Sequence, residues 1–467
     1  MPAVAFHLPP GISPEGTVDL EDPGGGPTLR AARFGDEGAR RLLDGLRASA
    51  AGLRARPVSR IVRTLGRVGE RFLDPSDPLR REAEARIPGE AGVTLPMARE
   101  IVTGMARDWT ANRLERMVLA DFPDPGVLDG FRLGPEAMQV RAVGDRLAFH
   151  VGAGNVPGVC ATSVIRSLVV KTPVLLKPGR GDVALACLFA RGLADEDGDL
   201  ASSLAVVYWP GGEGGALEGA ALERAERVVV YGDRETLAAL RDRAPVETPF
   251  VAYHHRISMG AIGRSRLGSP EAGAGLARAA ARAVALFDQR GCVSPLVIWV
   301  EEGGAVTPLA WAEALAEAMD RVSTELPPGP LDPSTAARVH HLRGSAELRK
   351  AAGSTDELFA APDGSWTVLF EPDPRPAAPC QGRTVHVKTL PDLAALPDAL
   401  EPFAPVLQSV ALEADEPRRV ELAERLAGAG VTRITRFEDQ PFPPPWWRHD
   451  GAGPLTPLVR WVGLEAS

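Results

Sequence analysis

The sequence contains little cysteine and no long apolar run, and both absences exclude classes of protein. Only four of its 467 residues are cysteine, namely Cys160, Cys187, Cys292 and Cys380. This number is too small for a disulfide framework, and no CxxC spacing indicates zinc, so we expect no metal. No stretch of about 18 uninterrupted apolar residues is present, which argues against a membrane-spanning helix. The first residues lack the basic start and apolar core of a secretory signal peptide, so we expect a cytoplasmic location.

An excess of positive charge is also missing. The chain has 52 Lys and Arg against 61 Asp and Glu, which gives a formal net charge of −9. A protein this acidic is not expected to attract nucleic acid through its overall field. Apolar residues make up 45% and charged residues 24%, a balance typical of globular proteins rather than disordered ones. At about 100–200 residues per domain, the length predicts two or three domains.

The spacing of apolar residues divides the chain into four segments. Residues 1–35 are rich in Pro and Gly and are predicted to be irregular, while the rest of segment 1–125 has the three- and four-residue apolar spacing of helices. Segment 126–265 alternates strands and helices, as does segment 266–430, and this alternation predicts an α/β fold with parallel sheets. Residues 431–467 are predicted to form a C-terminal strap. Among the predicted strands are 147–151, 174–177, 204–209, 227–231, 248–253 and 295–301.

The stretch FHVGAGNVPGVCATSVIRSLVVKTPVLLKPG, from Phe149 to Gly179, combines a strand, a glycine-rich turn, a helix and a second strand. The turn resembles a dinucleotide fingerprint, but its glycines are spaced GxGxxxG and Pro157 removes a backbone donor. The second strand ends in Lys177, where an acidic residue would normally bind a ribose. Lys177 can instead bind ribose hydroxyls or a 2′-phosphate, or can simply be a solvated strand end.

Two residues of this region and the next have the chemistry of an acyl-transfer site. Asn155 follows the glycines at the start of a predicted helix, where its amide can donate to an oxyanion or can cap the helix. Cys292 lies in LFDQRGCVSPLVIWVEE, at a junction of helix and strand where a thiolate can be stabilised. A lone cysteine is more often an inert core residue, and that alternative also applies to Cys160, Cys187 and Cys380.

The order of these motifs resembles the aldehyde dehydrogenase superfamily. Lys177-Pro178, the stretch YWPGGEGGALEGAAL and the strand VVVYGD follow one another as in that family's cofactor domain. The stretch EPFAPV, with Glu401 and Phe403, resembles its later motif near the nicotinamide ribose. GNVPG, KPG, the Cys-x-Ser-Pro junction and the ending WWRHDGAGPLTPLVRWV resemble one branch, the acyl-CoA reductases of the LuxC type. This resemblance covers residues 125–467.

The resemblance implies an aldehyde-dehydrogenase-like fold, with 126–265 as the dinucleotide-binding domain and 266–430 as the catalytic domain. It implies that Cys292 attacks a thioester carbonyl while Asn155 and the Cys292 N–H stabilise the oxyanion. The expected reaction is reduction of a fatty acyl-CoA or acyl-protein thioester to the aldehyde with NADPH, or with NADH. Acyl-transferase or acyl-activating subunits are the partners this resemblance suggests, and a homo-oligomer is expected.

The resemblance also assigns cofactor-binding residues. Lys177 and Pro178 would line the adenosine ribose, and Gly232 and Asp233 would lie near the pyrophosphate. No role follows for the pair His449-Asp450, although both residues match the family's ending.

One departure from the superfamily favours reduction over oxidation. The stretch FVAYHHRISMG, residues 250–260, stands where oxidising members carry a general-base Glu, and it contains no carboxylate. Without that base, attack of water on an acyl-cysteine should be slow. His254 or His255 can be an alternative base, or a polar strand end. Three other hypotheses stay open at this point: an aldehyde dehydrogenase that works in the oxidative direction, a reductase of an acyl phosphate such as a glutamyl phosphate, and a non-catalytic scaffold relative.

Overall fold

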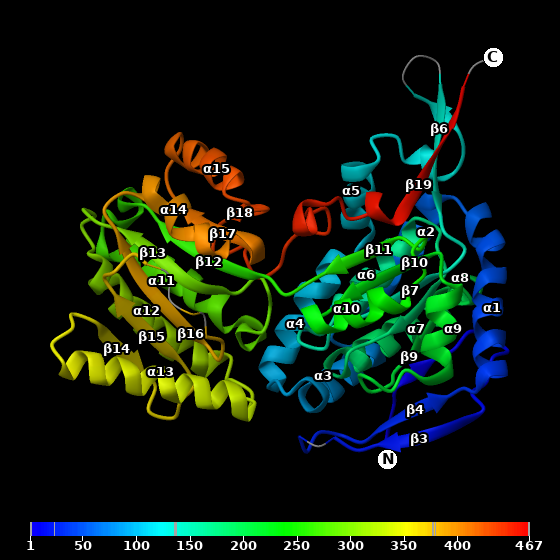
Figure 1. The fold of residues 1–467 in the computed structure, drawn as a ribbon, viewed down its shortest axis with the longest axis horizontal. Helices are drawn as coiled ribbons and strands as arrows, with labels where there is room; N and C mark the ends of the chain where they lie inside the picture. The colour runs from blue at the N-terminus through cyan, green and yellow to red at the C-terminus, as the bar shows by residue number, and fades with distance from the viewer. Residues whose placement is uncertain (1, 23, 135–137, 376–377, 379, 466–467) are drawn as a thin grey trace. The chain divides into compact units, whose positions relative to one another are not determined.

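The structure is a computed structural model that describes residues 2–22, 24–134, 138–375, 378 and 380–465. Contacts group the chain into two compact units, Met1–His254 with Pro444–Ser467, and His255–Pro443. Each unit is built around its own large sheet with helices on it, so the α/β prediction is confirmed (Figure 1). The strap predicted at 431–467 is therefore shared between the two units.

The large sheet of the first unit has the strand order β11-β10-β7-β8-β9-β2. Its strands are β2 (Phe6–His7), β7 (Ala148–Val151), β8 (Val174–Lys177), β9 (Leu204–Val207), β10 (Arg227–Tyr231) and β11 (Phe250–Tyr253). All neighbours are parallel except β2 and β9. The chain passes from β7 through β8 to β9 on one side and then crosses to β10 and β11 on the other. This reversal places a switch point between β7 and β10, and sheets of this kind bind ligands outside the carboxyl ends of such strands.

Helices cover both faces of this sheet. On one face, α1 (Asp36–Ala55) and α9 (Gly215–Arg224) contribute to a core that includes Leu42, Phe149 and Val228. On the other face, α6 (Val159–Val169) hydrogen-bonds to His150 of β7, and α7 (Val183–Glu196) packs beside α6. The N-terminal helices α2 (Val58–Leu73) and α3 (Pro78–Ala91) pack against α6 and α7, while α4 (Leu95–Asp108) and α5 (Ala111–Asp121) pack against α2.

The first 35 residues are not irregular, and that prediction was wrong. The strand β3 (Gly16–Leu20) pairs antiparallel with β4 (Leu29–Arg33), and β1 (Ala3–Val4) pairs parallel with β4. These strands are short, and the β4 sequence LRAAR has no alternation of apolar and polar residues. Their structure depends on pairing with distant chain, which local composition does not reveal.

The sheet of the second unit has the order β14-β15-β16-β13-β12-β17-β18, and only the β14–β15 pair is antiparallel. Its strands are β12 (Ile257–Ile262), β13 (Pro295–Glu301), β14 (Glu357–Ala360), β15 (Thr367–Glu371), β16 (Thr384–Leu390), β17 (Leu407–Glu413) and β18 (Arg433–Thr435). The helices α11 (Pro270–Ala285) and α12 (Pro308–Glu325) contact β13, β15 and β16, and α15 (Arg418–Gly428) packs on the apolar core around β12 and β17.

Three helices of the second unit begin in the same way. In α11, α12 and α13 (Pro333–Ala351), a proline at the first position follows a residue whose side chain caps the helix: Ser269, Thr307 and Asp332. Such a residue accepts hydrogen bonds from N–H groups that lack a partner within the helix, and proline needs no such partner. These starts are therefore encoded locally, and the helices near 306–320 and 332–352 were predictable to within a few residues.

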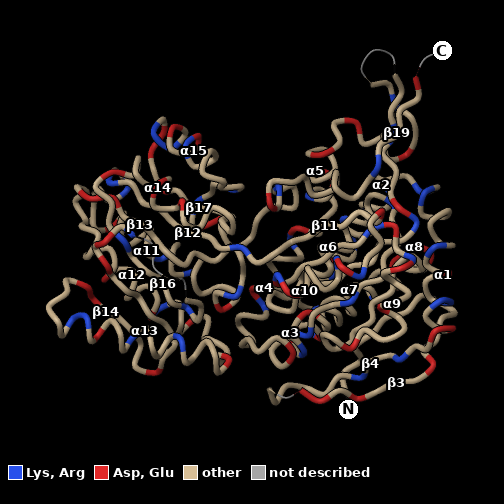
Figure 2. Tube along the Cα trace, in the orientation of Figure 1, with Lys and Arg blue, Asp and Glu red and all other residues tan. Residues whose placement is uncertain are grey.

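The C-terminal strap ends in a strand of the first unit. The strand β19 (Val459–Leu464) pairs antiparallel with β6 (Gln139–Gly144), which also pairs with β5 (Arg132–Leu133). Figure 2 shows that basic and acidic residues are interspersed along both units. No helix within the described ranges is both long and apolar enough to cross a membrane.

Candidate active site

The turn after β7 carries Asn155 at the carboxyl edge of the first sheet. Its glycines allow a direct contact between backbones: a Cβ on Gly154 would lie 2.9 Å from the N atom of Gly181, and one on Gly179 would lie 2.3 Å from the N atom of Gly154. Any larger residue would push these segments apart. The turn therefore lies directly against the loop that follows Lys177, the last residue of β8.

The N–H groups at the start of the helix after this turn bind Asp182, a residue that the sequence analysis missed. The N-cap of α6 is Gly158, so the hypothesis that Asn155 is an N-cap was wrong. The N–H groups of Gly158 and Cys160 donate to the two carboxylate oxygens of Asp182, at 2.7 and 2.8 Å. Burial raises the pKa of Asp182 to about 7. A fingerprint turn would offer these N–H groups to a pyrophosphate, so their use by Asp182 argues against that interpretation.

The predicted cofactor residues of the first unit flank the Asn155 turn. Lys177 ends β8, its Nζ lies 5.9 Å from the centre of the Tyr208 ring, and burial lowers its pKa. Gly232 and Asp233 follow β10, and the carboxylate of Asp233 accepts a hydrogen bond from the Thr236 N–H at 2.8 Å. Because β7 lies between β8 and β10, all of these residues lie at one edge of the sheet, on either side of the switch point. The basic Lys177 suits an anionic dinucleotide, whereas the N-terminus of α10 (Arg234–Arg243) is already capped by Asp233.

Cys292 belongs to the second unit and lies just before β13, at the amino edge of that sheet. It is half-buried, whereas Cys160, Cys187 and Cys380 are buried. Burial raises the pKa of all three, to about 12 for Cys187. A thiol that holds its proton is a poor nucleophile, so the accessible Cys292 is the best candidate of the four.

An unusual turn precedes Cys292. Phe287, Asp288 and Gln289 all have positive φ angles, of 58°, 50° and 60°, although none is glycine. The left-handed conformation costs an L-residue about 1–2 kcal/mol, so surrounding contacts must hold this turn. Asp288 accepts a hydrogen bond from Arg383 at 2.7 Å. Gln289 donates to the carbonyls of Pro295 and Thr384, and accepts from the Thr384 N–H. The helix predicted over 270–288 therefore ends earlier, at Ala285.

Two buried serines form a chain of hydrogen bonds that ends at the backbone carbonyl of Cys292. The Ser258 hydroxyl donates to the Cys292 carbonyl at 2.7 Å, and the Ser409 hydroxyl donates to that of Ser258 at 2.7 Å. Ser258 and Ser409 are neighbours across β12 and β17, and both are fully buried. Glu401 and Phe403 lie in the 3-10 segment Glu401–Val406 directly before β17, at the same amino edge as Cys292. Glu401 is exposed, and Phe403 packs partly against the core.

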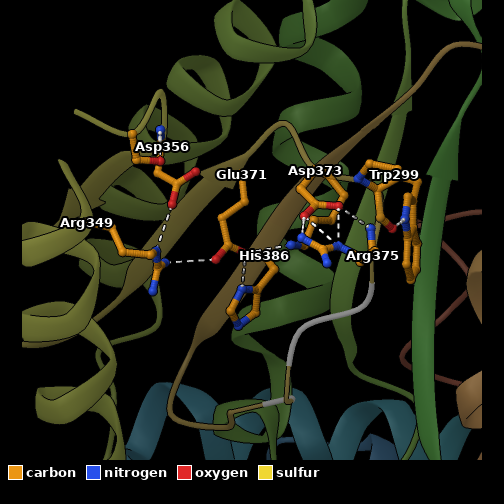
Figure 3. Close-up of polar contacts among 10 residues, drawn as sticks. Trp299, Arg349, Asp356, Glu371, Asp373, Arg375 and His386 are labelled. Atoms are coloured by element: carbon orange, nitrogen blue, oxygen red, sulfur yellow. Dashed lines mark hydrogen bonds and ion pairs between the residues drawn. The ribbon is translucent and has the colours of Figure 1, made fainter. Parts of the chain in front are cut away.

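A separate cluster of buried charges lies on β15 and β16 (Figure 3). Glu371 accepts from His386 Nδ1 and pairs with Lys388 Nζ, each at 2.9 Å, and it also pairs with Arg349. Burial alone would raise the pKa of Glu371, but its contacts with His386 and Lys388 lower it to about 2. The cluster satisfies its own charges, and we interpret it as part of the core of the second unit rather than as part of the Cys292 site.

The two histidines considered as alternative bases lie at the division of the chain: His254 ends a part of the first unit and His255 begins the second. Among the residues that the structure describes, no group of three or more His, Cys, Asp and Glu is arranged to hold a metal ion.

Comparisons with known proteins identify the family of the chain. A family model described as acyl-CoA reductase (LuxC) matches residues 53–461. A long-chain acyl-protein thioester reductase of Aliivibrio fischeri is 24% identical over 428 residues, which cover 87% of this chain and 82% of the relative.

Solved structures show the fold. Aldehyde dehydrogenase 21 from Physcomitrella patens aligns with a TM-score of 0.73 at 13% identity, covering 99% of this chain and 98% of that one. A NAD-dependent benzaldehyde dehydrogenase from Corynebacterium glutamicum aligns with a TM-score of 0.70 at 16% identity, covering 97% and 96%. The predicted aldehyde-dehydrogenase-like fold is therefore confirmed.

Proposed function

Because the chain belongs to the acyl-CoA reductase (LuxC) family, as its motifs predicted, we propose that it reduces a long-chain acyl thioester to the aldehyde through an acyl-cysteine on Cys292. The observation that carries the proposal is the position of Cys292. Cys292 is half-buried, whereas the other three cysteines are buried. It follows a turn whose strained conformation is held by buried hydrogen bonds. A nucleophile fixed in this way keeps its orientation before the substrate arrives, which lowers the entropic cost of attack.

The oxyanion formed by this attack needs donors, and we propose Asn155 and the Cys292 N–H. The Ser258 hydroxyl fixes the Cys292 carbonyl and so supports the orientation of the residue's backbone. Asn155 is exposed on a turn whose helix end is already satisfied by Asp182. The Asn155 amide therefore does not cap α6. Losing one oxyanion donor typically costs about 10²–10³ in rate.

A bound nicotinamide cofactor would supply the hydride that reduces the acyl-cysteine. Lys177 and Pro178 would hold its adenosine ribose, and Gly232 and Asp233 would lie beside its pyrophosphate, while Glu401 and Phe403 would face the nicotinamide ribose. The ammonium of Lys177, at the end of β8, favours a 2′-phosphate and hence NADPH over NADH. Residues 250–260 contain no carboxylate to activate water, which favours reduction of the acyl-cysteine over its hydrolysis.

The first test uses the purified chain with long-chain acyl-CoA and, separately, with the same acyl group as a thioester on a carrier protein. Aldehyde formation and NADPH or NADH oxidation are measured together. We expect wild-type turnover with at least one donor, none with Cys292→Ala, and normal turnover with Cys187→Ala as the matched control. Oxidation of aldehyde without any reduction of either thioester would contradict the proposal.

A second pair of variants tests the oxyanion donor. Asn155→Ala should lower the rate of acyl transfer by about 10²–10³. Asn112→Ala, which changes an exposed asparagine on α5, should leave it unchanged. Equal rates for both variants would remove Asn155 from the mechanism.

A further inference from the structure

A cavity in the second unit lies between α13 and loops at the amino edge of the sheet. Its volume is about 410 Å³, within the range of about 300–1,000 Å³ that is typical of small-molecule sites. Its walls are formed by residues 328–331, by α13, by the turn 363–365 between β14 and β15, and by Gly382 and Arg383 before β16. All of these residues lie between His255 and Pro443, so the cavity belongs to the second unit alone.

Two charged residues of the wall neutralise each other. Asp288 accepts hydrogen bonds from the Arg383 guanidinium at 2.7 and 3.1 Å and from the Gly329 N–H at 3.1 Å. Both Asp288 and Arg383 are fully buried. A third charged residue of the wall, Asp363, is exposed, and its carboxylate accepts a hydrogen bond from the Ser365 N–H at 2.9 Å. The charge of Asp363 is therefore screened by water, and the buried pair is satisfied within the wall.

Arg343 of α13 also lines the cavity, but its charge has no such partner. Its guanidinium donates to the Thr367 hydroxyl at 2.8 Å and to the carbonyls of Ala361 and Trp366 at 3.2 and 2.7 Å. These three acceptors are neutral, and no carboxylate in the described part of the chain forms an ion pair with Arg343. A guanidinium has five N–H donors, so two of them remain for another acceptor.

Burial makes this missing partner matter. Arg343 is half-buried, and burial lowers its pKa by more than the distant carboxylates raise it. A cation that leaves water without gaining an anion is destabilised, and a ligand anion in the cavity would relieve that cost. A carboxylate suits this position, because its two oxygens match two N–H groups of a guanidinium.

Another part of the wall is apolar. The apolar residues that line the cavity come from α13 and from the segment before it, and they are Pro328, Pro330, Leu331, Ala336 and Val339. His340 of the same helix also lines the cavity, and it is exposed. A ligand that fills this space therefore combines an anionic group with an apolar chain, since burial of the chain on these side chains is favourable.

We propose that the cavity binds an organic carboxylate with an apolar chain, whose carboxylate pairs with Arg343 and whose chain lies on Leu331 and Val339. This binding site is separate from the chemistry proposed for Cys292 and does not depend on it. The buried pair that supports the turn before Cys292 is part of the same wall, so the bound carboxylate contacts the support of that turn.

The test is a calorimetric titration of the full chain with octanoate, acetate and octanamide. Octanoate has both the charge and the chain, acetate lacks the chain, and octanamide has the same chain without the charge. The first variant is Arg343→Met, and its control is Arg338→Met, which changes an exposed arginine of α13 outside the wall.

A second variant covers the case in which Arg343→Met does not fold, because that change also removes three internal hydrogen bonds. Ala336→Trp fills the cavity from an exposed position of α13 and leaves Arg343 in place. Its control is Ala337→Trp, at the next exposed position, which does not line the cavity.

We expect the wild type to bind octanoate about tenfold or more tightly than acetate or octanamide, since the charge-assisted hydrogen bonds and the burial of the chain both contribute. Arg343→Met and Ala336→Trp should each weaken octanoate binding by about tenfold or more, because each removes one of these contributions. The two control variants should bind octanoate within about twofold of wild type, since surface substitutions away from a site have small effects.

Equal affinity for octanoate and octanamide would exclude an ion pair with Arg343, and equal affinity for octanoate and acetate would exclude the apolar wall. Octanoate binding that stays at the wild-type level in Ala336→Trp would place the ligand outside the cavity. Each of these results, like a wild type that binds no octanoate, overturns this inference. None of them bears on the proposed function, which is decided separately by turnover of the acyl donors and its loss in Cys292→Ala.

Discussion

Gln289→Ala should weaken the second unit and slow the reaction of Cys292. The side chain of Gln289 is fully buried and makes hydrogen bonds to the Pro295 carbonyl at 3.0 Å, the Thr384 carbonyl at 2.7 Å and the Thr384 N–H at 2.8 Å. A buried polar group that loses its partner costs about 1–3 kcal/mol. With the lower value for each of these groups, the variant should lose about 3 kcal/mol of unfolding free energy.

The same substitution should move Cys292. The left-handed turn of residues 287–289 stores about 1–2 kcal/mol per residue, and Gln289 is one of the side chains that hold it. Once these bonds are gone, the turn can relax toward the right-handed helix that precedes it, α11. A displacement of about 1 Å at a reacting atom can cost 10²-fold in rate, so acyl transfer should fall by about 10–10²-fold.

Two measurements check this reasoning. Urea unfolding followed by tryptophan fluorescence reports the stability, and alkylation of Cys292 by iodoacetamide reports the geometry of the loop. Gln139→Ala, which changes an exposed glutamine on β6, is the matched control. A variant with wild-type stability and wild-type alkylation would refute the claim that buried hydrogen bonds hold a strained turn. A loss of stability with unchanged alkylation would limit the role of Gln289 to folding.

Three further variants test other parts of the structure. Glu371→Gln should lower the unfolding free energy at pH 7 by about 3 kcal/mol, because the pKa of Glu371 in the folded state, about 2, lies below its ordinary value of 4.5. In urea unfolding, the difference in unfolding free energy between wild type and variant should shrink as the pH falls from about 4.5 toward 2. Asp121→Ala removes the acceptor of two N–H groups of the strap, so it should cost about 2–6 kcal/mol and speed proteolysis after Pro443. Asp121→Asn, which keeps an acceptor oxygen, should lose less. Lys177→Met should weaken NADPH binding more than NADH binding in calorimetric titrations, and equal losses would show that Lys177 does not contact a 2′-phosphate.

The parts of the fold that the sequence predicted are those with strong local signals. The strands β8, β10 and β13 have the predicted bounds, since each is a short apolar run bordered by turn residues. The strand β12, ISMGAI, was missed because its glycine and serine interrupt the apolar run that marks a buried strand. Its structure comes from its neighbours β13 and β17, which lie far away in the sequence.

The sequence suggested the proposed reacting residues of the candidate site, but it did not suggest the residues that support their loops. Asn155, Lys177 and Cys292 stand in motifs that a family resemblance can identify. The left-handed turn before Cys292 contains no glycine or asparagine, the usual signals of such a turn, and its sequence LFDQ reads as the end of a helix. The bonds that stabilise it come from Arg383 and Thr384, at the start of a strand far along the chain.

The loops that carry Asn155 in the first unit and Cys292 in the second unit are supported in a similar way, and this explains which substitutions should matter. In the first unit, the turn after β7 is held by Asp182, which follows the neighbouring strand β8. In the second unit, the turn before β13 is held by contacts with Thr384, which begins the neighbouring strand β16. In each case a proposed reacting residue lies on a loop, and that loop is supported by a buried polar contact with a residue at or just beyond the end of the adjacent strand. Loops of this kind keep their geometry without substrate. Substitution of Asp182 or Gln289 should therefore change the rate of acyl transfer, even though it leaves the proposed reacting groups of Asn155 and Cys292 in place.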